Sequence, residues 1–261
     1  MKALNIAATG MMAQEMNVNI ISNNIANMRT TGYKRQRVDF QDLYNQNLRR
    51  QGASTSEAGT IVPAGVQVGS GVRVVATPRI MSQGDIEQTD KDTDVAVRGE
   101  GYVQVQMPDG RTGYTRDGSF EIDATGTIVT QDGYSVLPAI TVPPNSKDLT
   151  ISQTGTVQVT VGNATTPTVL GQIQLARFVN KAGLEAIGDN LFVETTSSGA
   201  ALVGNPGDEG FGTMLQGHLE MANVVPVSEL SSLIAAQRAY EMNSRIIRAA
   251  DEMSQAIANL K

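Results

Sequence analysis

The chain has 261 residues, 40% of them hydrophobic and 18% charged, a length that supports one large domain or two smaller ones. Its formal net charge of −6 argues against a nucleic-acid partner. With no cysteine and a single histidine, His218, little remains for metal or triad chemistry, and His218 is expected to be a hydrogen-bonded structural residue. Residues 90–94 open like a calcium loop but lack the glycine and glutamate that complete one. We therefore expect a protein that is not an enzyme, with no catalytic residue, metal or cofactor.

The first 28 residues predict a long helix with very little charge. Lys2 and Glu15 are the charged side chains there, and apolar residues recur at alternating steps of three and four positions. No apolar run approaches the roughly 18 residues of a membrane span, and polar residues interrupt any secretion-signal core, so neither is expected. The predicted apolar seam consists of Leu4, Ala7, Met11, Gln14, Val18, Ile21, Ile25 and Met28.

Between about residues 52 and 222 the composition shifts to Gly, Thr, Val, Asp and Pro. Polar and apolar residues alternate at 72–74, 102–106, 156–161 and 172–175, which predicts strands with one buried face. Gly, Pro, Asn and Asp mark the turns between them. This region is predicted to be a hairpin-rich β domain.

A second long helix is predicted at the C-terminus. Asn223, Pro226 and Ser228 favour its start, and Glu229 suits the first turn. Each terminal helix has an apolar stripe and neither has another helix to bury it, so we expect the two to pair. The seam of this helix is predicted at Leu233, Ala236, Tyr240, Asn243, Ile247, Ala250, Ser254 and Ile257.

The expected fold is therefore α+β, a mainly-β central domain with long terminal helices that pair as a coiled-coil-like layer. We expect residues 1–30 and 223–261 to form the terminal helical domain. Residues 31–75 would be an extended connecting segment, and residues 76–222 the β-rich domain.

A helix so poor in charge admits two interpretations. It is either buried within its own domain or buried against identical helices of neighbouring copies, in contacts that can generate an open filament. In the second case, a charge at Ile25 or Ile247 should abolish assembly and leave the β domain folded. The helix contacts between subunits would be made by Leu4, Met11, Val18, Ile25, Leu233, Tyr240, Ile247 and Ile257.

Two motifs at opposite ends of the chain resemble the signatures of the bacterial flagellar rod and hook protein family. The first spans residues 22–27 and 30–35, and the second spans residues 236–244 with 250–253. Stretches of the central region at 94–102, 114–120 and 183–191 are also similar to rod subunits. The positions that carry the terminal motifs are Asn23, Asn24, Asn27, Gly32, Tyr33, Gln237, Arg238, Tyr240 and Asn243.

The resemblance implies a structural subunit of the distal part of the flagellar rod. Such subunits would polymerise into a helical hollow tube that transmits motor torque to the hook and filament. Their expected partners are other copies of the chain, the proximal rod, hook and ring proteins, and the flagellar type III export apparatus. The expected location is the basal body, from the periplasm to the outer membrane. A proximal rod or hook subunit is the alternative, although hook proteins usually carry an added outer domain.

The basic residues after the first helix also admit two interpretations. They either pair with acidic loops of adjacent copies or form a solvated face beside Asp39 and Asp42. Residues 1–50 carry seven basic and three acidic side chains, against thirteen and twenty-three in the rest of the chain. The basic residues concerned are Lys34, Arg35, Arg37, Arg49 and Arg50.

Overall fold

The computed structural model describes residues 2–49, 51, 64–162 and 166–259, which fall into two compact units. The chain crosses from one unit to the other four times, so each is assembled from segments far apart in the sequence. None of the helices in the described residues is long and apolar enough to cross a membrane. The helical unit comprises Met1–Ile25, Gln36–Pro78 and Val225–Lys261, and the β unit comprises Ala26–Arg35 and Arg79–Val224.

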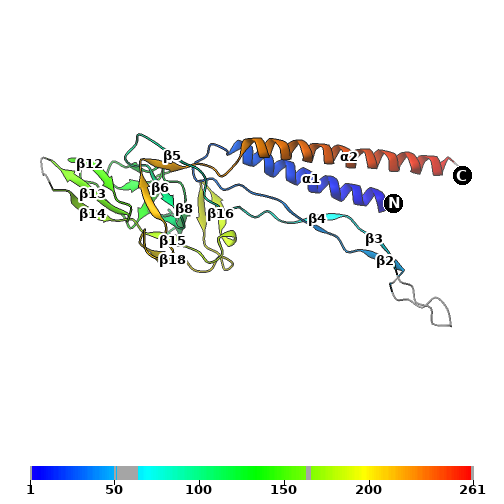
Figure 1. Ribbon diagram of the computed structural model, residues 1–261, viewed down its shortest axis with the longest axis horizontal. Helices are drawn as coiled ribbons and strands as arrows, with labels where there is room; N and C mark the ends of the chain where they lie inside the picture. Colours follow the sequence, from blue (N-terminus) through cyan, green and yellow to red (C-terminus); the bar gives the residue numbers. More distant parts are fainter. Residues whose placement is uncertain (1, 50, 52–63, 163–165, 260–261) are drawn as a thin grey trace. The chain divides into compact units, whose positions relative to one another are not determined.

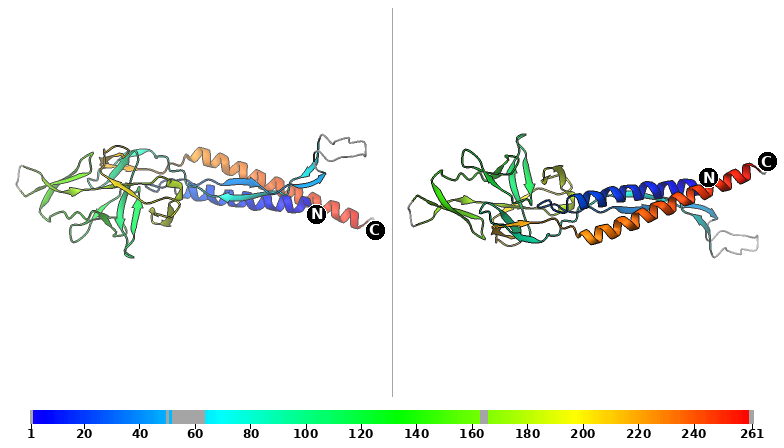
Figure 2. Two further views of the ribbon diagram at one scale, coloured as in Figure 1. Left: turned by 90° about the horizontal axis from the view of Figure 1, so that it is seen from below. Right: turned by 90° about the horizontal axis from the view of Figure 1, so that it is seen from above.

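Two long antiparallel helices form most of the helical unit. Helix α1 spans Lys2–Ala26 and helix α2 spans Pro226–Ala258, and they lie side by side in every view of Figures 1 and 2. Gly10 of α1 faces the side chain of Asn243 in α2, and a Cβ added at Gly10 would lie 2.8 Å from Nδ2 of Asn243. Both predicted helices, and the start of the second at Pro226, are confirmed.

The buried side of the helix pair is lined mainly by small residues. The predicted seam is correct at Ala7 and Ile21, whereas Met11, Val18 and Ile25 are only half-buried on its flank. Where Gly10 faces the side chain of Asn243, there is no room for a long side chain between the helices. The buried residues of the two helices are Ala7, Ala13, Ile20, Ile21, Asn24, Glu229, Ala236 and Ala250.

The rest of the helical unit is a pair of narrow antiparallel ribbons. Strand β1 (Asp39–Asp42) pairs with β4 (Val72–Ala76), and β2 (Gln46–Arg49) pairs with β3 (Val66–Val68). A two-stranded ribbon is marginal on its own. The backbone N–H of Val72 donates to the hydroxyl of Thr9 at 3.3 Å, and this bond ties the ribbon to α1.

The β unit is organised around one curled sheet of nine strands. Its continuous path is β16-β17-β8-β7-β11-β10-β9, while β15 pairs with both β7 and β18. Neighbouring strands are antiparallel. The strands are β7 (Tyr102–Gln106), β8 (Thr112–Thr115), β9 (Glu121–Ile122), β10 (Ile128–Val129), β11 (Ser135–Leu137), β15 (Leu175–Arg177), β16 (Glu185–Gly188), β17 (Leu191–Val193) and β18 (Leu202–Gly204).

Smaller antiparallel pairings complete the β unit. A three-stranded sheet has the order β12-β13-β14, and two-stranded pairs join β19 to β6 and β20 to β5. A single 3₁₀ turn within the described residues covers Lys181–Gly183. The strands are β5 (Ile86–Gln88), β6 (Val95–Arg98), β12 (Ser146–Ile151), β13 (Thr156–Val161), β14 (Thr168–Gln172), β19 (Thr213–Gln216) and β20 (His218–Glu220).

These sheets enclose a dense aliphatic core that contains Val105, Val157 and Leu175, each fully buried. The strands predicted at 102–106 and 156–161 are β7 and β13, and the α+β fold is confirmed. The prediction of one strand at 172–175 is wrong. Strand β14 ends at Gln172, the N–H of Ile173 donates to the carbonyl of Gly155 at 2.8 Å, and β15 starts at Leu175 in the other sheet.

Candidate functional site: polar clusters built by the terminal motifs

Asn24 of the N-terminal motif organises a buried polar cluster in the helical unit. Its side chain is 1% exposed, and Nδ2 donates to the carbonyl of Gln36 at 2.8 Å while Oδ1 accepts from the N–H of Gln36 at 2.9 Å. The same Nδ2 donates to the carboxylate of Glu229 at 3.2 Å, in the first turn of α2. The side-chain amide of Asn24 therefore holds both the backbone of Gln36, twelve residues further on, and the first turn of α2 at Glu229. We call Asn24, Gln36 and Glu229 the helix-end cluster.

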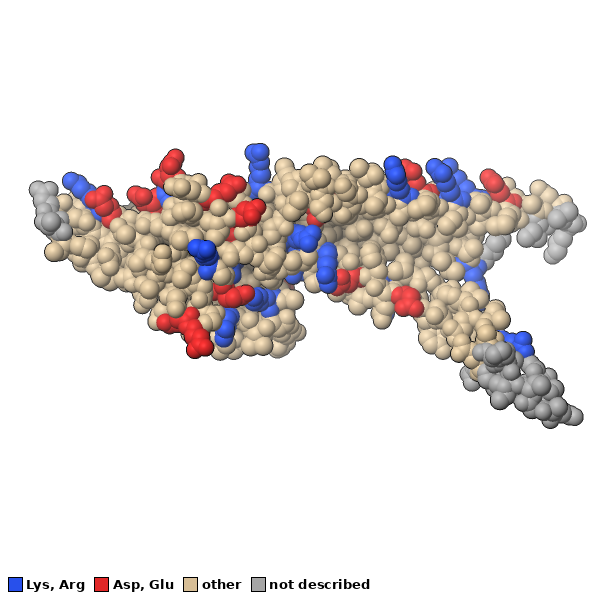
Figure 3. Space-filling view, in the orientation of Figure 1, with Lys and Arg blue, Asp and Glu red and all other residues tan. Residues whose placement is uncertain are grey.

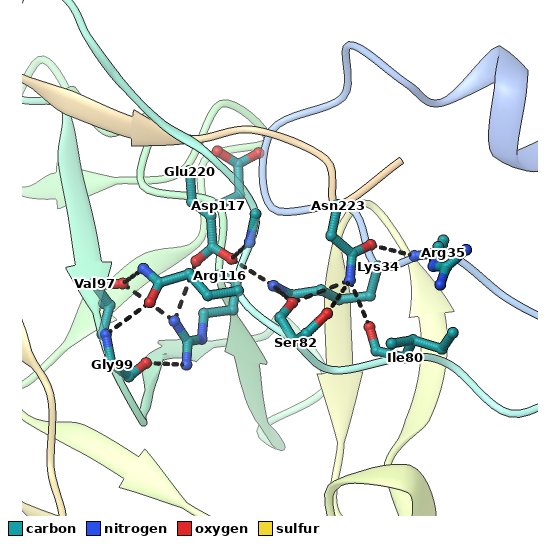
Figure 4. A network of polar contacts seen from close by, with 12 residues as sticks. Lys34, Arg35, Ile80, Ser82, Val97, Gly99, Arg116, Asp117, Glu220 and Asn223 are labelled. Atoms are coloured by element: carbon teal, nitrogen blue, oxygen red, sulfur yellow. Dashed lines mark hydrogen bonds and ion pairs between the residues drawn. The ribbon is translucent and has the colours of Figure 1, made fainter. Parts of the chain in front are cut away.

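In the β unit, Lys34 enters a fully buried ionic site. Its ammonium donates to the carboxylate of Glu220 and to the carbonyl of Ser82, the latter at 2.8 Å (Figure 4). The side chains of Lys34 and Glu220 are 1% and 0% exposed. A buried lysine is tolerated when it is paired and hydrogen-bonded, as it is here.

Arg116 is the second cation on the same carboxylate. Its Nη1 lies 3.1 Å from Oε2 of Glu220, and the guanidinium also donates to the carbonyls of Val97 and Gly99. The N–H of Gly84 donates to Oε1 of Glu220 at 3.0 Å. The carboxylate is thus held by donors from three separate stretches of chain. We call Lys34, Arg116 and Glu220 the charge cluster.

The charge cluster holds two cations against one anion, and so carries a formal charge of +1. Burial lowers the pKa of the Lys34 ammonium, and the Glu220 carboxylate opposes this effect. Arg116 also lies over the ring of Tyr102 at 5.1 Å, which adds a cation–π contact. Burial raises the pKa of Tyr102 to about 12.

Asn223 joins two further segments beside the charge cluster. Its Oδ1 accepts from the N–H of Arg35 at 2.8 Å, and its Nδ2 donates to the carbonyls of Ile80 and Ser82 at 2.8 and 3.0 Å (Figure 4). Like Asn24, it uses its amide as a substitute for a backbone peptide. The sequence predicts a helix-start role for Asn223, and the structure gives it this bridging role instead.

The motif residues next to Lys34 are packed rather than exposed. Tyr33 is 8% exposed and forms a small apolar cluster with Ala222 and Val224. Gly32 has a φ of +67°, and an added Cβ would lie 2.7 Å from the backbone nitrogen of Asp117. Glycine is required there on both counts, because the conformation is left-handed and the neighbouring backbone cannot move aside.

The C-terminal motif and the remaining asparagines are placed differently. Asn243 is half-buried opposite Gly10, whereas Gln237 and Arg238 are exposed on α2. Asn23 is exposed and Asn27 is half-buried, its side chain accepting from the hydroxyl of Thr30 at 3.2 Å.

The residues predicted to form subunit contacts lie along the flanks of the helix pair. Tyr240 is 39% exposed, and the side chain of Ile257 lies outside the described residues. The half-buried members of this set are Leu4, Met11, Val18, Ile25, Leu233 and Ile247.

The structure corrects the interpretation of the basic residues after α1. Lys34 cannot meet an adjacent copy, because its own chain buries it on Glu220. Arg37 is exposed and pairs with Asp39 at 3.0 Å, as the solvated-face alternative predicts. Arg50 lies outside the described residues.

Sequence reasoning did not identify Glu220 and Arg116. Glu220 ends the short strand β20 and Arg116 follows β8, and neither strand has a sequence pattern that marks these residues as buried. His218 is partly buried with Nδ1 2.7 Å from the carbonyl oxygen of Gln216, in agreement with a structural role. Within residues 2–49, 51, 64–162 and 166–259, no three acidic or histidine side chains are arranged to hold a metal ion.

Helix α2 also carries large apolar side chains that its own chain leaves exposed. Leu230, Ile234, Met242, Ile246 and Met253 are each about half exposed, between 48% and 59%. In Figure 3 the charged side chains on the visible face of α2 gather along its upper edge. A helix with apolar residues on two sides buries only one of them in a two-helix pair.

Three family models match the chain, and together they contain every member of the two clusters except Gln36. The model described as "Flagella basal body rod protein" matches residues 4–34, which include Asn24 and Lys34. That of the "Flagellar hook protein FlgE/F/G D1 domain" matches residues 96–159, with Arg116. That of the "Flagellar basal body rod FlgEFG protein C-terminal" matches residues 215–260, with Glu220.

Relatives match over the full length. The chain is 54% identical to the flagellar basal-body rod protein FlgG of Caulobacter vibrioides, over 100% of both chains. It is 48% identical to FlgG of Agrobacterium fabrum over 100% of both, and 36% identical to FlgG of Bacillus subtilis over 100% of this chain and 99% of the relative. These matches, in a chain with two paired terminal helices and a β unit, place it among the rod and hook proteins of the flagellum. The chain belongs to the flagellar basal-body rod protein family.

Proposed function

We propose that the chain is a structural subunit of the distal rod of the bacterial flagellar basal body, and that identical copies polymerise into a helical hollow tube. The tube transmits motor torque to the hook and filament. Full-length likeness to rod proteins supports this role over that of a hook subunit. Identity to FlgG rod proteins reaches 54%, over the full length of both chains.

The observation that carries the proposal is the uncovered apolar side of α2. The helix pair buries mostly alanine at its line of contact, while larger apolar side chains such as Ile246 and Met242 stay exposed. Burial of these side chains between copies would stabilise an assembly by about 25 cal/mol per Å² of apolar surface. Contacts between different surfaces of identical subunits repeat without closing and generate a helical polymer.

The half-buried residues on the flanks of the helix pair are proposed to extend the contact between copies. They are apolar, lie on both helices and remain partly accessible in one chain, as interface residues of a helical assembly must be. This set includes Leu4, Met11, Val18, Ile25, Leu233, Tyr240 and Ile247.

The proposed role also defines partners and location. Besides its own copies, the subunit would contact proximal rod, hook and ring proteins, and it would leave the cytoplasm through the flagellar type III export apparatus. It would reside in the basal body between the periplasm and the outer membrane. Torque transmission requires interfaces that resist shear and needs no catalytic group.

A charge on the exposed side of α2 tests the proposal. The variant Ile246→Asp should retain the helical content and melting temperature of the parent, because Ile246 is 48% exposed. It should fail to assemble in sedimentation and to restore motility to cells that lack the parent protein. The matched control is Ile187→Asp on β16, where the isoleucine is 43% exposed. Normal assembly of Ile246→Asp would contradict the proposed interface.

A further inference from the structure

Residues 30–35, here called the strap, cross the β unit without belonging to any of its strands. The strap lies between two other segments. On one side, the N–H of Gly32 donates to the carbonyl of Glu220 at 2.7 Å and the N–H of Asn223 donates to the carbonyl of Tyr33 at 3.4 Å. On the other side, the N–H of Ile80 donates to the carbonyl of Arg35 at 2.9 Å. The backbone contacts resemble those of a short inserted strand.

The apolar contacts of the strap are separate from the main cores. Tyr33 packs with Ala222 and Val224 in a cluster distinct from the aliphatic core and from the aromatic cluster around Tyr102. The strap therefore supplies no side chain to either larger cluster, and Arg79, which lies over the rings of Tyr33 and Phe192 at 5.9 and 5.8 Å, is the residue between them. Regions with few buried apolar contacts open at lower free energy than the core of a protein.

The charge cluster is also divided between the strap, which carries Lys34, and the rest of the β unit, which carries Glu220 and Arg116. With the strap in place, Glu220 faces Lys34 and Arg116, and the formal charge is +1. Without the strap, Glu220 keeps Arg116 at 3.1 Å and the N–H of Gly84 at 3.0 Å. The β unit then holds a neutral, hydrogen-bonded pair, whereas an unpaired buried charge would oppose opening.

From these contacts we infer that the strap is a latch, which opens and closes on a folded β unit and which Lys34 fastens to Glu220. The strap is the part of the N-terminal segment that belongs to the β unit, so its opening frees that segment while the sheets remain formed. The inference concerns a single chain and stands whether or not copies polymerise.

Hydrogen–deuterium exchange on the monomeric full-length chain tests the latch. The reporters of the strap are the amides of Gly32, Arg35, Ile80 and Asn223, which make the bonds described above. The reporters of the core are the buried, bonded amides of Val95, Ile173 and Met214. The variant Lys34→Met should raise exchange of the strap reporters by up to about tenfold, because a charged hydrogen bond is lost. The core reporters should not change.

Two controls separate the latch from general loss of stability. Lys147→Met replaces an exposed lysine on β12 and should leave both sets of reporters unchanged. Gly32→Ala should open the strap by steric conflict with the backbone of Arg116 and Asp117. Gly110→Ala imposes similar backbone strain, with a φ of +85°, in open space and should leave the strap closed.

Three results would overturn the inference. One is unchanged exchange of the strap reporters in both Lys34→Met and Gly32→Ala. Another is an equal rise at strap and core reporters, which would make the strap part of one cooperative unit with the sheets. The third is failure of both variants to fold, because a latch must be able to open on a folded β unit.

Discussion

Glu220 is the residue on which the buried charges of the β unit depend. It is 1% exposed and neutralises one of two cations that lie against it. Its removal would leave Lys34 and Arg116 buried together without an anion. Removal of Lys34 would leave a neutral pair, so the two changes should have unequal effects although they break the same ion pair.

We predict that Glu220→Gln lowers the free energy of unfolding of the β unit by about 3–5 kcal/mol, the usual effect of leaving a buried charge unpaired. Lys34→Met should lower it by less than about 1.5 kcal/mol, as expected of an apolar replacement of similar length. Urea unfolding followed by circular dichroism measures both. Equal losses in the two variants would show that Arg116 does not sustain Glu220 by itself.

A second prediction concerns alkaline pH. Burial raises the pKa of Tyr102 from 10.0 to about 12, so the unfolded chain loses this proton at lower pH than the folded chain. The stability that Tyr102 contributes is complete below pH 10 and is lost as the pH rises from 10 towards 12. A shift of two pKa units corresponds to about 2.7 kcal/mol as an order of magnitude.

Tyr102→Phe should therefore reduce the fall in melting temperature between pH 9 and pH 11. It cannot abolish the fall, because the pKa of Tyr114 is also raised to about 12 by burial. Tyr44→Phe is the control, since Tyr44 is 84% exposed and should leave the pH profile unchanged. Identical profiles for Tyr102→Phe and the parent would rule out Tyr102 as a source of the alkaline loss.

The residue scale is also where the sequence is least informative. The motif that contains Lys34 can be read directly, but its partner lies 186 residues away. Composition and periodicity carry no information about a pairing at that separation. Lys34 therefore looks like one member of an exposed basic run, and the tertiary fold reverses that interpretation. The sequence motif includes Asn24, but its contact with Glu229 depends on helices that meet only in the folded chain.

The element scale is far more predictable. A helical period over 28 residues and strict alternation at 102–106 and 156–161 each define an element by short-range physics. Which face of each helix points toward the other helix is not predictable in the same way. The helical period alone favours the large apolar residues as the buried ones, whereas the structure buries four alanines and leaves Met11, Val18 and Ile25 only half-buried.

The third prediction tests the contact between Gly10 and the side chain of Asn243. Gly10→Leu should separate α1 from α2 and lower the melting temperature of the helical signal, because a Cβ at this position already lies 2.8 Å from Asn243. Gly10→Ala should be close to neutral, since the atom it meets is the movable end of a side chain and alanine gains about 1 kcal/mol of helix propensity. Ala8→Leu, on the exposed side of α1, is the control. Equal effects of leucine at positions 8 and 10 would contradict the packing.

At the scale of the whole molecule, the two units have very different cores. The buried apolar side chains described in the helical unit are two isoleucines and four alanines. The aliphatic core of the β unit contains Phe120, Met214 and many valines, isoleucines and leucines, each nearly inaccessible. Burial stabilises in proportion to apolar area, and alanine contributes little of it. Helices of this length also depend on packing for most of their stability in water.

We therefore predict that an isolated subunit loses the helical unit before the β unit. Limited proteolysis of the monomer, with fragments identified by mass spectrometry, should cut first within residues 1–25, 36–78 and 225–261 and leave a resistant fragment near 79–224. In assembled material the same sites should become protected, because neighbouring copies would bury the apolar side of α2. Equal resistance of both units in the monomer would mean that the helix pair is already stable, and assembly would then join preformed helices instead of completing their burial.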